Sequence, residues 1–469
     1  MSPLWTSDEI AEATGGTVSA PFEATGVTFD SREVDPGDLF VAMPGSVHDG
    51  HKFVEAAFAA GAAGAVVSQR GADTENWGSH VLVGDTFAAL QALARTARER
   101  THAKIIGVTG SVGKTSTKEA LYAALGRSHP GKVHRSVKSY NNHTGVPLSL
   151  ARMPRDCGFA ILEMGMNNAG EIATLTRLVR PHLALITAIA PAHIENLGSE
   201  EAIADAKAEI FQGLEPDGIA LLPNDSAHRD RLVRAARRHA DRIITFGGGD
   251  ADVHAVHAVG AKGGGSLITA ALLERELTFT ISQRGEHWVT NSLAVLAAVE
   301  ALGADAALAG LALADMGGLK GRGQRHRVPI DGGELLLIDE SYNANPASMA
   351  ATLKSLGDER DARRRIAVLG PMRELGAHSD ALHAGLAPAV LDAHVDELIL
   401  IGEEMRPLAE QVVGKISLDL VFSVDEAIDG LLAKVHPGDA VLVKASNSVG
   451  LAKLVERVAS GVGERACST

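Results

Sequence analysis

The chain has 469 residues, 45% of them hydrophobic, which is too long for one core and predicts about two to four domains. Lys and Arg number 44 against 58 Asp and Glu, and the net charge of −14 is opposite to that of a non-specific nucleic-acid binder. Two cysteines without a CxxC pair argue against a disulfide framework or a thiolate metal site, so a reducing compartment is expected.

No membrane or export segment is apparent. Residues 1–16, MSPLWTSDEIAEATGG, have early acids and no apolar core, so a secretory signal is not expected. No run of about 18 apolar residues occurs, so no segment is expected to insert into a membrane. We expect a cytoplasmic protein, and a monomer, because no pattern indicates a dimer seam.

Fifty glycines and only 4% aromatic residues are typical of an α/β chain with many strand-to-helix turns. The first unit, residues 1–98, begins with a helix-like stretch. GVTFDSREVDPGDLFVAM (26–43) follows, with β-type runs separated by turns. FVEAAFAAGAAGAVVS (53–68) predicts a helix, a glycine stop and a strand, and a helix over 87–100 leads out of the unit.

The second unit, residues 99–325, alternates strands with helices. KIIGVTG (104–110) precedes a helix from about Lys114. The apolar runs FAILEMG (159–165), HLALITAIAPAH (182–193) and IALLPND (219–225) predict buried parallel strands. One helix is expected over 200–214 and another over 285–303, with a β-rich stretch at 247–285 between them.

The third unit, residues 326–469, repeats the same alternation. Strands are expected at 334–341, 365–370, 397–402 and 439–447, with helices from Ala347 and over 381–391. This pattern predicts an open sheet of its own. The predicted fold is therefore α/β with three domains: an N-terminal domain, a central parallel-sheet domain, which GVTGSVGKTS (107–116) indicates to be a P-loop ATPase domain, and a C-terminal Rossmann-like domain.

The stretch GVTGSVGKTS (107–116) predicts a phosphate-binding loop. A strict Walker A spacing would place glycine at Val108, so this is a tighter variant, T-G-x-x-G-K-T. Its backbone N–H groups and the following helix N-terminus suit an anion, Lys114 suits β- and γ-phosphate oxygens, and Thr115 offers a hydroxyl to Mg²⁺. The alternative is a glycine-rich turn that only stabilises the fold.

Two further positions suit the metal side of a bound nucleotide. Glu163 lies at the carboxyl end of a predicted strand, where open α/β sheets bind ligands, and His193 is expected to end the next strand. Mg²⁺ prefers oxygen, so an imidazole alone would be unusual, and both could be ordinary polar groups. On pattern alone Lys207 is a solvated helical lysine and Cys157 an inert loop thiol.

Together these stretches resemble the Mur ligase family over nearly the whole chain. The motifs are DSR…GDLFVAMPG…DGHKF (30–53), TGSVGKTS (109–116), NNHTGVPLSL (141–150), EMGMNNAGEI (163–172), AHIENLGSEEAIADAKAEIF (192–211), GEHWVTNSLAVLAAVEALG (285–303), KGRGQRH (320–326), DESYNANPASM (339–349), VLGPMRELG (368–376) and VKASNSVGL (443–451). Three of these motifs, YNANP, MRELG and EMGMNNAGEI, resemble those of the family members that add D-alanyl-D-alanine.

The resemblance implies an ATP-dependent amide ligase acting through an acyl phosphate in peptidoglycan precursor synthesis. Its substrates would be a UDP-N-acetylmuramoyl-tripeptide and D-alanyl-D-alanine. The first domain would hold the UDP-sugar, the central domain ATP and the third domain the amine substrate. Two Mg²⁺ ions are implied, with a carbamylated Lys207 bridging the second.

The resemblance also implies roles for individual residues. The catalytic set would be Lys114, Glu163, His193, Lys207 and Arg322, and the metal set would be Thr115, Glu163, His193 and Lys207. The nucleotide set would be Gly110, Ser111, Val112, Gly113, Lys114, Thr115, Ser116, Asn291, Arg322 and Asp339, with Asn291 beside adenine and Asp339 beside ribose. The substrate set would be Ser31, Arg32, Asp49, Gly50, His51, Asn141, Asn142, Thr144, Gly145, Asn343 and Asn345.

Four positions depart from the family pattern. Glu340 stands where Asp often follows the ribose-binding acid, and Pro371 replaces the usual Asp before MRELG. Ala445 and Asn447 stand where Gly and Arg are common. The last three positions lie in the stretches expected to meet the incoming dipeptide, so those contacts are the least certain part of the resemblance.

Three other functions stay open. A related ligase could add one amino acid, diaminopimelate or lysine, to a UDP-muramoyl-dipeptide, although a DNPR-like motif is absent, or glutamate to folate, although DSR–GDLF argues against it. A P-loop NTPase switch would form no covalent product, but it would need the strict loop spacing. An inactive nucleotide-binding partner of the cell-wall machinery would not need Lys114, Thr115 and Glu163.

Overall fold

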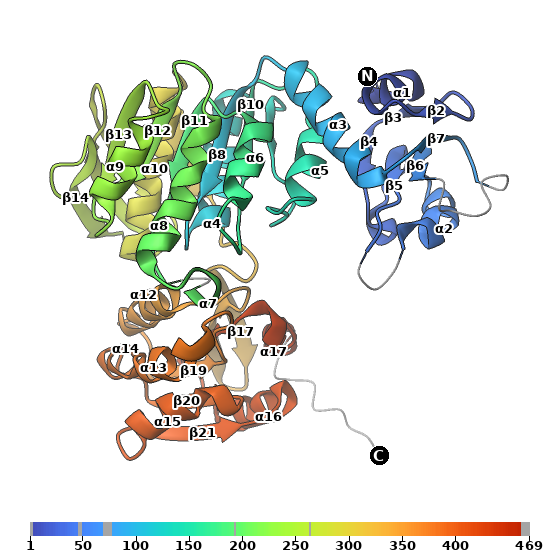
Figure 1. Ribbon diagram of the computed structural model, residues 1–469. Coiled ribbons are helices and arrows are strands. Elements are labelled where there is room, and N and C mark those ends of the chain that lie inside the picture. Colours follow the sequence, from blue (N-terminus) through green and yellow to red (C-terminus); the bar gives the residue numbers. More distant parts are fainter. Residues whose placement is uncertain (1–2, 46–48, 69–76, 192–193, 262–263, 461–469) are drawn as a thin grey trace, which may run out of the picture.

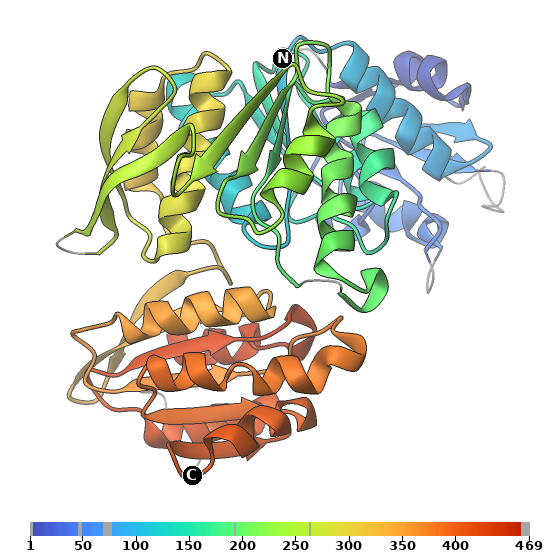
Figure 2. The ribbon, with the colours of Figure 1, turned by 60° about the vertical axis from the view of Figure 1, so that its left-hand side comes forward.

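A computed structural model describes residues 3–45, 49–68, 77–191, 194–261 and 264–460. These residues form three sheet-centred units that follow one another along the chain (Figure 1). The first and third units both adjoin the central one, and the third lies at one end of it in two views (Figure 1, Figure 2). Among the described residues no helix is both long and apolar enough to cross a bilayer.

The first unit has a sheet in the order β2-β7-β6-β5-β4, parallel except for the β2–β7 pair. Its strands are β2 (Thr17–Val18), β4 (Gly26–Thr28), β5 (Asp38–Val41), β6 (Gly64–Ser68) and β7 (His80–Val83), and β1 (Trp5–Thr6) pairs with β3 (Glu23–Ala24). Its helices are α1 (Ser7–Thr14), η1 (Ser31–Glu33), η2 (Gly50–Phe53), α2 (Val54–Ala59) and α3 (Thr86–Glu99).

Helix α3 joins the first unit to the second. Asp85 caps its N-terminus by accepting a 2.9 Å hydrogen bond from Ala88 N, and Leu90 and Leu93 lie on its buried face. Each fully buried leucine contributes roughly 2 kcal/mol of apolar burial. The helix therefore fixes how the first unit is attached to the second.

The central sheet has the order β16-β15-β14-β13-β12-β11-β8-β10-β9 in the described part of the chain, parallel from β9 to β14. Its strands are β8 (Lys104–Thr109), β9 (Val133–Arg135), β10 (Phe159–Glu163), β11 (Leu183–Ile186), β12 (Ile219–Pro223), β13 (Arg242–Gly247), β14 (Val253–Gly260), β15 (Ser266–Ala271) and β16 (Glu276–Ile281). Its helices are α4 (Lys114–Ser128), α5 (Gly145–Ala151), α6 (Glu171–Val179), α7 (Ile194–Leu197), α8 (Glu200–Ala208), η4 (Glu209–Gly213), α9 (Arg229–Ala236), α10 (Glu286–Ala301) and α11 (Ala306–Asp315).

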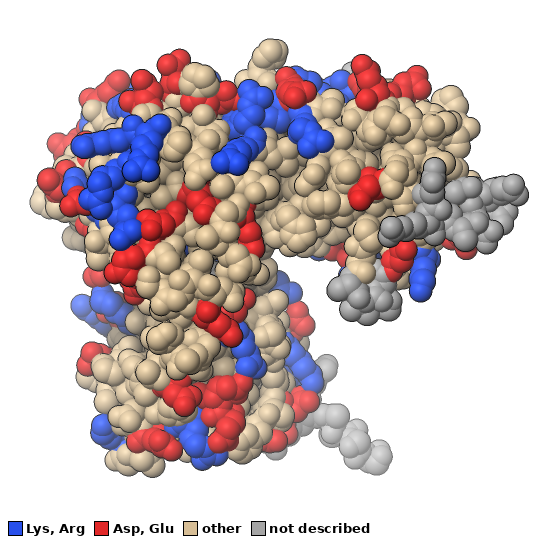
Figure 3. Space-filling view, viewed as in Figure 1, with Lys and Arg blue, Asp and Glu red and all other residues tan. Residues whose placement is uncertain are grey.

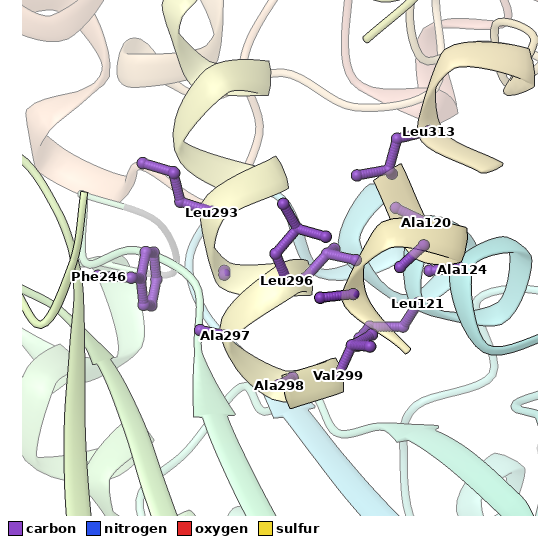
Figure 4. Close-up of a cluster of buried hydrophobic side chains, with 14 of the residues drawn as sticks. Ala120, Leu121, Ala124, Phe246, Leu293, Leu296, Ala297, Ala298, Val299 and Leu313 are labelled. Atoms are coloured by element: carbon purple, nitrogen blue, oxygen red, sulfur yellow. The ribbon is translucent and has the colours of Figure 1, made fainter. Parts of the chain in front are cut away.

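Both faces of this sheet are covered, which explains the continuous apolar runs in its strands. Successive residues of β8 point to opposite faces, so Ile105 packs in one buried cluster and Ile106 in the other. In the second cluster Leu121 of α4, Leu296 of α10 and Leu313 of α11 lie together (Figure 4). This packing holds the start of α4, and with it the glycine loop, against the sheet.

The third unit has the order β17-β18-β22-β19-β20-β21, parallel apart from the β17–β18 hairpin. Its strands are β17 (Gln324–Ile330), β18 (Gly333–Glu340), β19 (Arg365–Leu369), β20 (Glu397–Ile401), β21 (Ser417–Val421) and β22 (Ala440–Lys444). Its helices are α12 (Pro346–Gly357), η5 (Gly376–His378), α13 (Ser379–Ala384), α14 (Ala387–Asp392), η6 (Glu403–Met405), α15 (Arg406–Val412), α16 (Val424–Lys434), η7 (Asn447–Val449) and α17 (Ala452–Ala459).

Three expected elements are corrected by the structure. The strand expected over 182–193 ends at Ile186, because the next residues leave the sheet and bind the glycine loop: Thr187 donates to the Val112 carbonyl at 2.5 Å. The helix expected over 200–214 continues as the 3₁₀ helix η4 after Ala208. The helix expected over 381–391 is two helices, with Gly385 at the end of α13 and Pro388 in the first turn of α14.

Candidate active site

The glycine loop lies between the end of β8 and the start of α4. Gly113 adopts φ +84° as the N-cap of α4, a left-handed conformation that side chains disfavour. Gly110 adopts φ +151°, and a Cβ placed there would clash with the hydroxyl of Thr187. The loop is thus a backbone cradle at a helix N-terminus, the arrangement that binds phosphate.

The Lys114 side chain folds back on its own loop. Its Nζ donates a 2.7 Å hydrogen bond to the Gly110 carbonyl. Burial lowers the pKa of the Lys114 ammonium, Glu163 opposes this shift, and Arg322 adds to it. Two cations therefore face the same space, and an anion bound there would offset their repulsion.

Glu163 ends β10 and is 1% exposed. Its Oε2 accepts a 2.9 Å hydrogen bond from the Thr115 hydroxyl, and its Oε1 accepts a 2.8 Å hydrogen bond from the Asn141 amide. The structure thus brings together the hydroxyl and the carboxylate that the sequence assigned to a metal. Two oxygen donors beside a phosphate cradle fit Mg²⁺, which prefers oxygen ligands and substrate phosphates.

Lys207 is a buried residue of α8, 1% exposed, and not the solvated lysine that helix pattern alone indicates. Burial lowers the pKa of its ammonium well below the ordinary value, and the charge of Lys114 adds to this effect. In the described part of the chain no carboxylate pairs with it. A lowered pKa favours the neutral amine, which is the nucleophilic form of a lysine side chain. His193, the other residue assigned to the metal side, lies outside the described residues.

A cavity of about 540 Å³ opens between the glycine loop and the third unit. It is lined by Ser111, Val112, Gly113, Lys114, Thr115, Ser139, Asn141, Asn142, Glu163, Gly165, Met166, Asn167, Glu171, Arg322, Tyr342, Asn343, Ala344, Asn345, Arg373, Glu374, Leu375, Ser446, Asn447 and Ser448. The lining is mostly polar and comes from the central unit, the segment before β17 and the third unit. A substrate lying there would contact both units at once.

A second cavity, of about 420 Å³, shares part of this wall. It is lined by Val112, Gly113, Ser116, Thr187, Ala188, Ile189, Pro223, Asp225, Ser226, His287, Trp288, Thr290, Asn291, Gly321, Arg322, Glu340, Asn343, Asn345, Ala347, Ser348, Ala351, Thr352 and Lys444. Its apolar part, beside Trp288 and Asn291 of α10, suits a planar base. Burial lowers the pKa of His287 to about 4, so this imidazole is neutral at physiological pH.

Arg322 lies in the segment just before β17, and residues of the third unit hold it in place. The Arg322 guanidinium lies 4.4 Å from the centroid of the Tyr342 ring, which holds it at the boundary of the two cavities. Asp339, expected beside ribose, is 2% exposed and lines neither cavity. Its carboxylate accepts hydrogen bonds from Gly321 N at 2.8 Å and from the Ser341 hydroxyl at 2.6 Å, so it fixes the turn that carries Arg322.

Lys444 lines the second cavity although no role is predicted for it from the sequence, and it lies beside Glu340, which the sequence marks only as a departure from the family pattern. Lys444 of β22 is 2% exposed, donates to the Asn343 carbonyl at 2.8 Å and lies 3.5 Å from Glu340. Burial raises the pKa of Glu340 and lowers the pKa of Lys444. The signal that could have found them is position, since both end adjacent parallel strands at the carboxyl edge of the third sheet.

The residues expected to bind the sugar nucleotide in the first unit lie outside both cavities. Gly50 packs against the backbone of Met43, and His51 Nδ1 lies 2.6 Å from Asp49 Oδ1 while its Nε2 accepts from Ser68 N at 2.9 Å. Ser31 and Arg32 begin η1, where Arg32 is paired with Asp30 at 2.6 Å. Of the 141–145 loop, Asn141 and Asn142 line the first cavity, and the side-chain Oδ1 of Asn142 accepts hydrogen bonds from the Thr144 hydroxyl and from Gly145 N.

Comparisons with known proteins cover nearly the whole chain. Three family domains match: the Mur ligase family catalytic domain at residues 23–107, the Mur ligase middle domain at 108–299 and the Mur ligase glutamate ligase domain at 321–447. A UDP-N-acetylmuramoyl-tripeptide–D-alanyl-D-alanine ligase of Bacillus subtilis is 34% identical and covers 96% of this chain and 97% of its own. The protein of the same name from Synechocystis is 36% identical, with 94% and 93% covered.

Solved structures give the same result. MurF from Acinetobacter baumannii superposes with a TM-score of 0.83 at 28% identity, covering 97% of this chain and 99% of its own. MurF from Thermotoga maritima, solved in complex with ADP, has a TM-score of 0.76 at 27% identity, with 94% and 98% covered. The three-unit arrangement described above is therefore shared with these enzymes.

Proposed function

The chain belongs to the Mur ligase family, and on that premise we propose that it joins D-alanyl-D-alanine to a UDP-N-acetylmuramoyl-tripeptide in peptidoglycan precursor synthesis. It is an ATP-dependent carboxylate–amine ligase that releases ADP and phosphate. The observation that carries the assignment is the shared wall of the two cavities, where Val112, Gly113 and Arg322 face both. A nucleotide in one cavity and a peptide in the other would meet there.

The reaction has two steps. A carboxylate oxygen of the tripeptide attacks the γ-phosphorus of ATP, the bond to the β-phosphate oxygen breaks, and an acyl phosphate and ADP result. The free amine of D-alanyl-D-alanine then attacks the acyl carbon, loses a proton and expels phosphate to leave the amide. The first step brings two anions together, and each pair of unit charges at about 4 Å repels by roughly 4 kcal/mol at an effective dielectric near 20.

The residues of the cleft offset this repulsion. Lys114 in the glycine loop and Arg322 in the segment just before β17 face the same space, and the loop N–H groups add partial positive charge. We assign Thr115 and Glu163 to a Mg²⁺ ion because they present a hydroxyl and a carboxylate 2.9 Å apart beside the cradle. When bound, the ion would neutralise phosphate charge.

We further propose that Lys207 is carbamylated and serves a second Mg²⁺ ion. Its neutral amine would attack CO₂, lose a proton and become a carbamate, which exchanges a buried cation for an anionic oxygen ligand. The low pKa of the buried amine supports this assignment. His193 stays a predicted ligand.

The remaining substrate contacts are also proposals. Adenine would lie beside Asn291 and Trp288 in the second cavity, and the role of Asp339 toward ribose stays a prediction. The uridine diphosphate would meet Ser31, Arg32, Asp49, Gly50 and His51, and the sugar and diphosphate would meet Asn141, Asn142, Thr144 and Gly145. The dipeptide would occupy the third-unit wall of the first cavity, near Arg373 and Asn447, while Asn343 and Asn345 face both cavities.

Closure of the three units accompanies the proposed reaction. On the face shown in Figure 3 a wide gap separates the first unit from the third. A sugar nucleotide held by the first unit must deliver its peptide to the loop, and closing would exclude the water that hydrolyses an acyl phosphate. X-ray scattering should show a smaller radius of gyration with an ATP analogue and the sugar nucleotide together. An unchanged radius would contradict closure.

The proposed enzyme acts in the cytoplasm as a single chain. The identity of the reaction products tests the proposed function. A panel of UDP-muramoyl-dipeptides and tripeptides, the latter ending in diaminopimelate or lysine, is offered with ATP and either D-alanyl-D-alanine or a single amino acid, diaminopimelate or lysine, and products are identified by mass spectrometry. We expect mass gain only with a tripeptide. ADP release should require both acceptor and amine. Release without either would indicate a P-loop switch, and a gain with dipeptide and a single amino acid would indicate another Mur ligase.

A further inference from the structure

Lys118 is a fully buried lysine of α4, 0% exposed, one turn after Lys114. Its ammonium lies 3.2 Å from Glu119 Oε1 and 3.9 Å from Glu163 Oε2. It also donates to the backbone carbonyls of Ser136, at 3.4 Å, and Lys138. A buried ammonium is tolerated only where acceptors surround it, so these contacts fix its place closely.

The two carbonyls belong to one loop, residues 136–142. At its start Ser136 N donates to the Ile161 carbonyl at 2.9 Å, and the Ser136 hydroxyl accepts from Glu163 N at 2.8 Å. At its end the Asn141 carbonyl accepts from Gly165 N at 2.8 Å, and the Asn141 amide donates to Glu163 Oε1 at 2.8 Å. The loop therefore wraps around Glu163, with Lys118 bound to its middle.

The same loop reaches the first unit. Lys138 has φ +48°, a left-handed conformation that costs energy for a residue with a side chain. In this conformation its carbonyl accepts from Lys118 while its own ammonium pairs with Glu33 of η1. Glu33 directly follows Ser31 and Arg32, the proposed sugar-nucleotide residues. One segment thus links the start of α4 to the first unit.

We propose that Lys118 is a positioning residue that sets loop 136–142 for both substrates. By holding the loop carbonyls and facing Glu163, it keeps Asn141 on that carboxylate, Asn142 toward the cleft and Lys138 toward Glu33. In this arrangement Lys118 contacts neither substrate, and it does not contact the third-unit wall of the first cavity, which we assign to the dipeptide. Its effect on the reaction rests on the proposed ligation, but its effect on nucleotide binding does not.

Replacement of Lys118 by Met, which keeps the length of the side chain and removes its charge, tests the assignment. The half-saturating Mg²⁺ concentration and KM for the sugar nucleotide should each rise about tenfold, the scale of a lost charge-assisted hydrogen bond, with KM for D-alanyl-D-alanine within about twofold. A purely structural role would lower the folded fraction, and so kcat, without moving these constants. Lys132→Met, which removes an exposed lysine paired with Asp156 just before β9, is the matched control.

Binding of a fluorescent ATP analogue against Mg²⁺ concentration gives a readout independent of ligation. Absence of ligation by wild type and Lys132→Met would refute the proposed function alone. A folded Lys118→Met protein, checked by near-ultraviolet circular dichroism, with wild-type Mg²⁺ and sugar-nucleotide constants would overturn the positioning role.

A second pair of variants covers the case in which Lys118→Met does not fold. Lys138→Gly and Lys138→Val both remove an exposed ammonium, but Gly accepts φ +48° and Val resists it. Only the Val variant should turn the Lys138 carbonyl away from Lys118. We expect its Mg²⁺ and sugar-nucleotide constants to exceed those of the Gly variant severalfold. Equal constants in the two variants would also overturn the proposal.

Discussion

Thr115 and Glu163 meet across the central sheet: the hydroxyl at the start of α4 donates a 2.9 Å hydrogen bond to the carboxylate at the end of β10. The two residues are 48 positions apart in sequence. They come together because β8 and β10 are adjacent parallel strands whose carboxyl ends share one edge. A metal ion and a nucleotide phosphate would both be held at this edge.

Lys114 should be essential for turnover. Replacing it with Ala removes the cation that faces the terminal phosphates, and we expect ADP release to fall by at least about a thousandfold. Lys104→Ala, at the opposite and exposed end of β8, should keep wild-type rates. ATP-dependent ligation that survived in the Lys114 variant would show that the loop has another role.

Lys207→Ala should lose activity that small carboxylates partly restore. Truncation leaves a space where the carbamate would lie, and formate or acetate can supply a carboxylate there. We expect a loss of at least about a hundredfold, with recovery measured as ADP release against added formate. Chloride added at the same concentration as formate serves as the control for ionic strength. Unaltered activity in the variant would remove the carbamate from the mechanism.

Arg322→Lys should lower kcat more than it raises the KM for ATP. Lysine keeps the charge, but it lacks the planar guanidinium that lies 4.4 Å from the Tyr342 ring and can bind phosphate oxygens in pairs. We expect kcat to fall about ten- to a hundredfold. Tyr342→Phe keeps the aromatic face and should retain near-normal kcat. A fall of similar size in Tyr342→Phe would mean that the hydroxyl, rather than the ring, matters.

Stability should decrease between pH 6.5 and pH 4 because of His134. Burial lowers the pKa of this imidazole from 6.5 to about 4, and its Nε2 lies 2.7 Å from the Ser149 carbonyl. In this window the unfolded chain binds a proton that the folded chain does not. The free energy of unfolding therefore falls by about 1.4 kcal/mol for each pH unit of acidification. Above pH 6.5 both states are neutral and the contribution is flat.

Urea denaturation of His134→Gln and wild type across this range checks the prediction. Gln can still donate to the carbonyl but does not titrate, so its free energy of unfolding should decrease less steeply with falling pH. Parallel curves for the two proteins would show that His134 does not carry the acid sensitivity.

The sequence by itself determined the α/β class, the three successive sheets and the glycine loop, because each depends on short-range patterns. Continuous apolar runs mark strands covered on both faces, and the Gly-Lys-Thr turn between a strand and a helix marks the cradle. Even the errors had local signals: Gly385 and Pro388 interrupt the helix expected over 381–391.

Only the tertiary structure decided which side chains serve the site. Lys118 follows helical spacing like any other lysine, yet packing of α4 under loop 136–142 buries it between two carboxylates and two carbonyls. Likewise Asp339 is turned toward Gly321 and Ser341, while Glu340 faces the cleft. Such contacts join residues that are distant in sequence, so no local pattern could specify them.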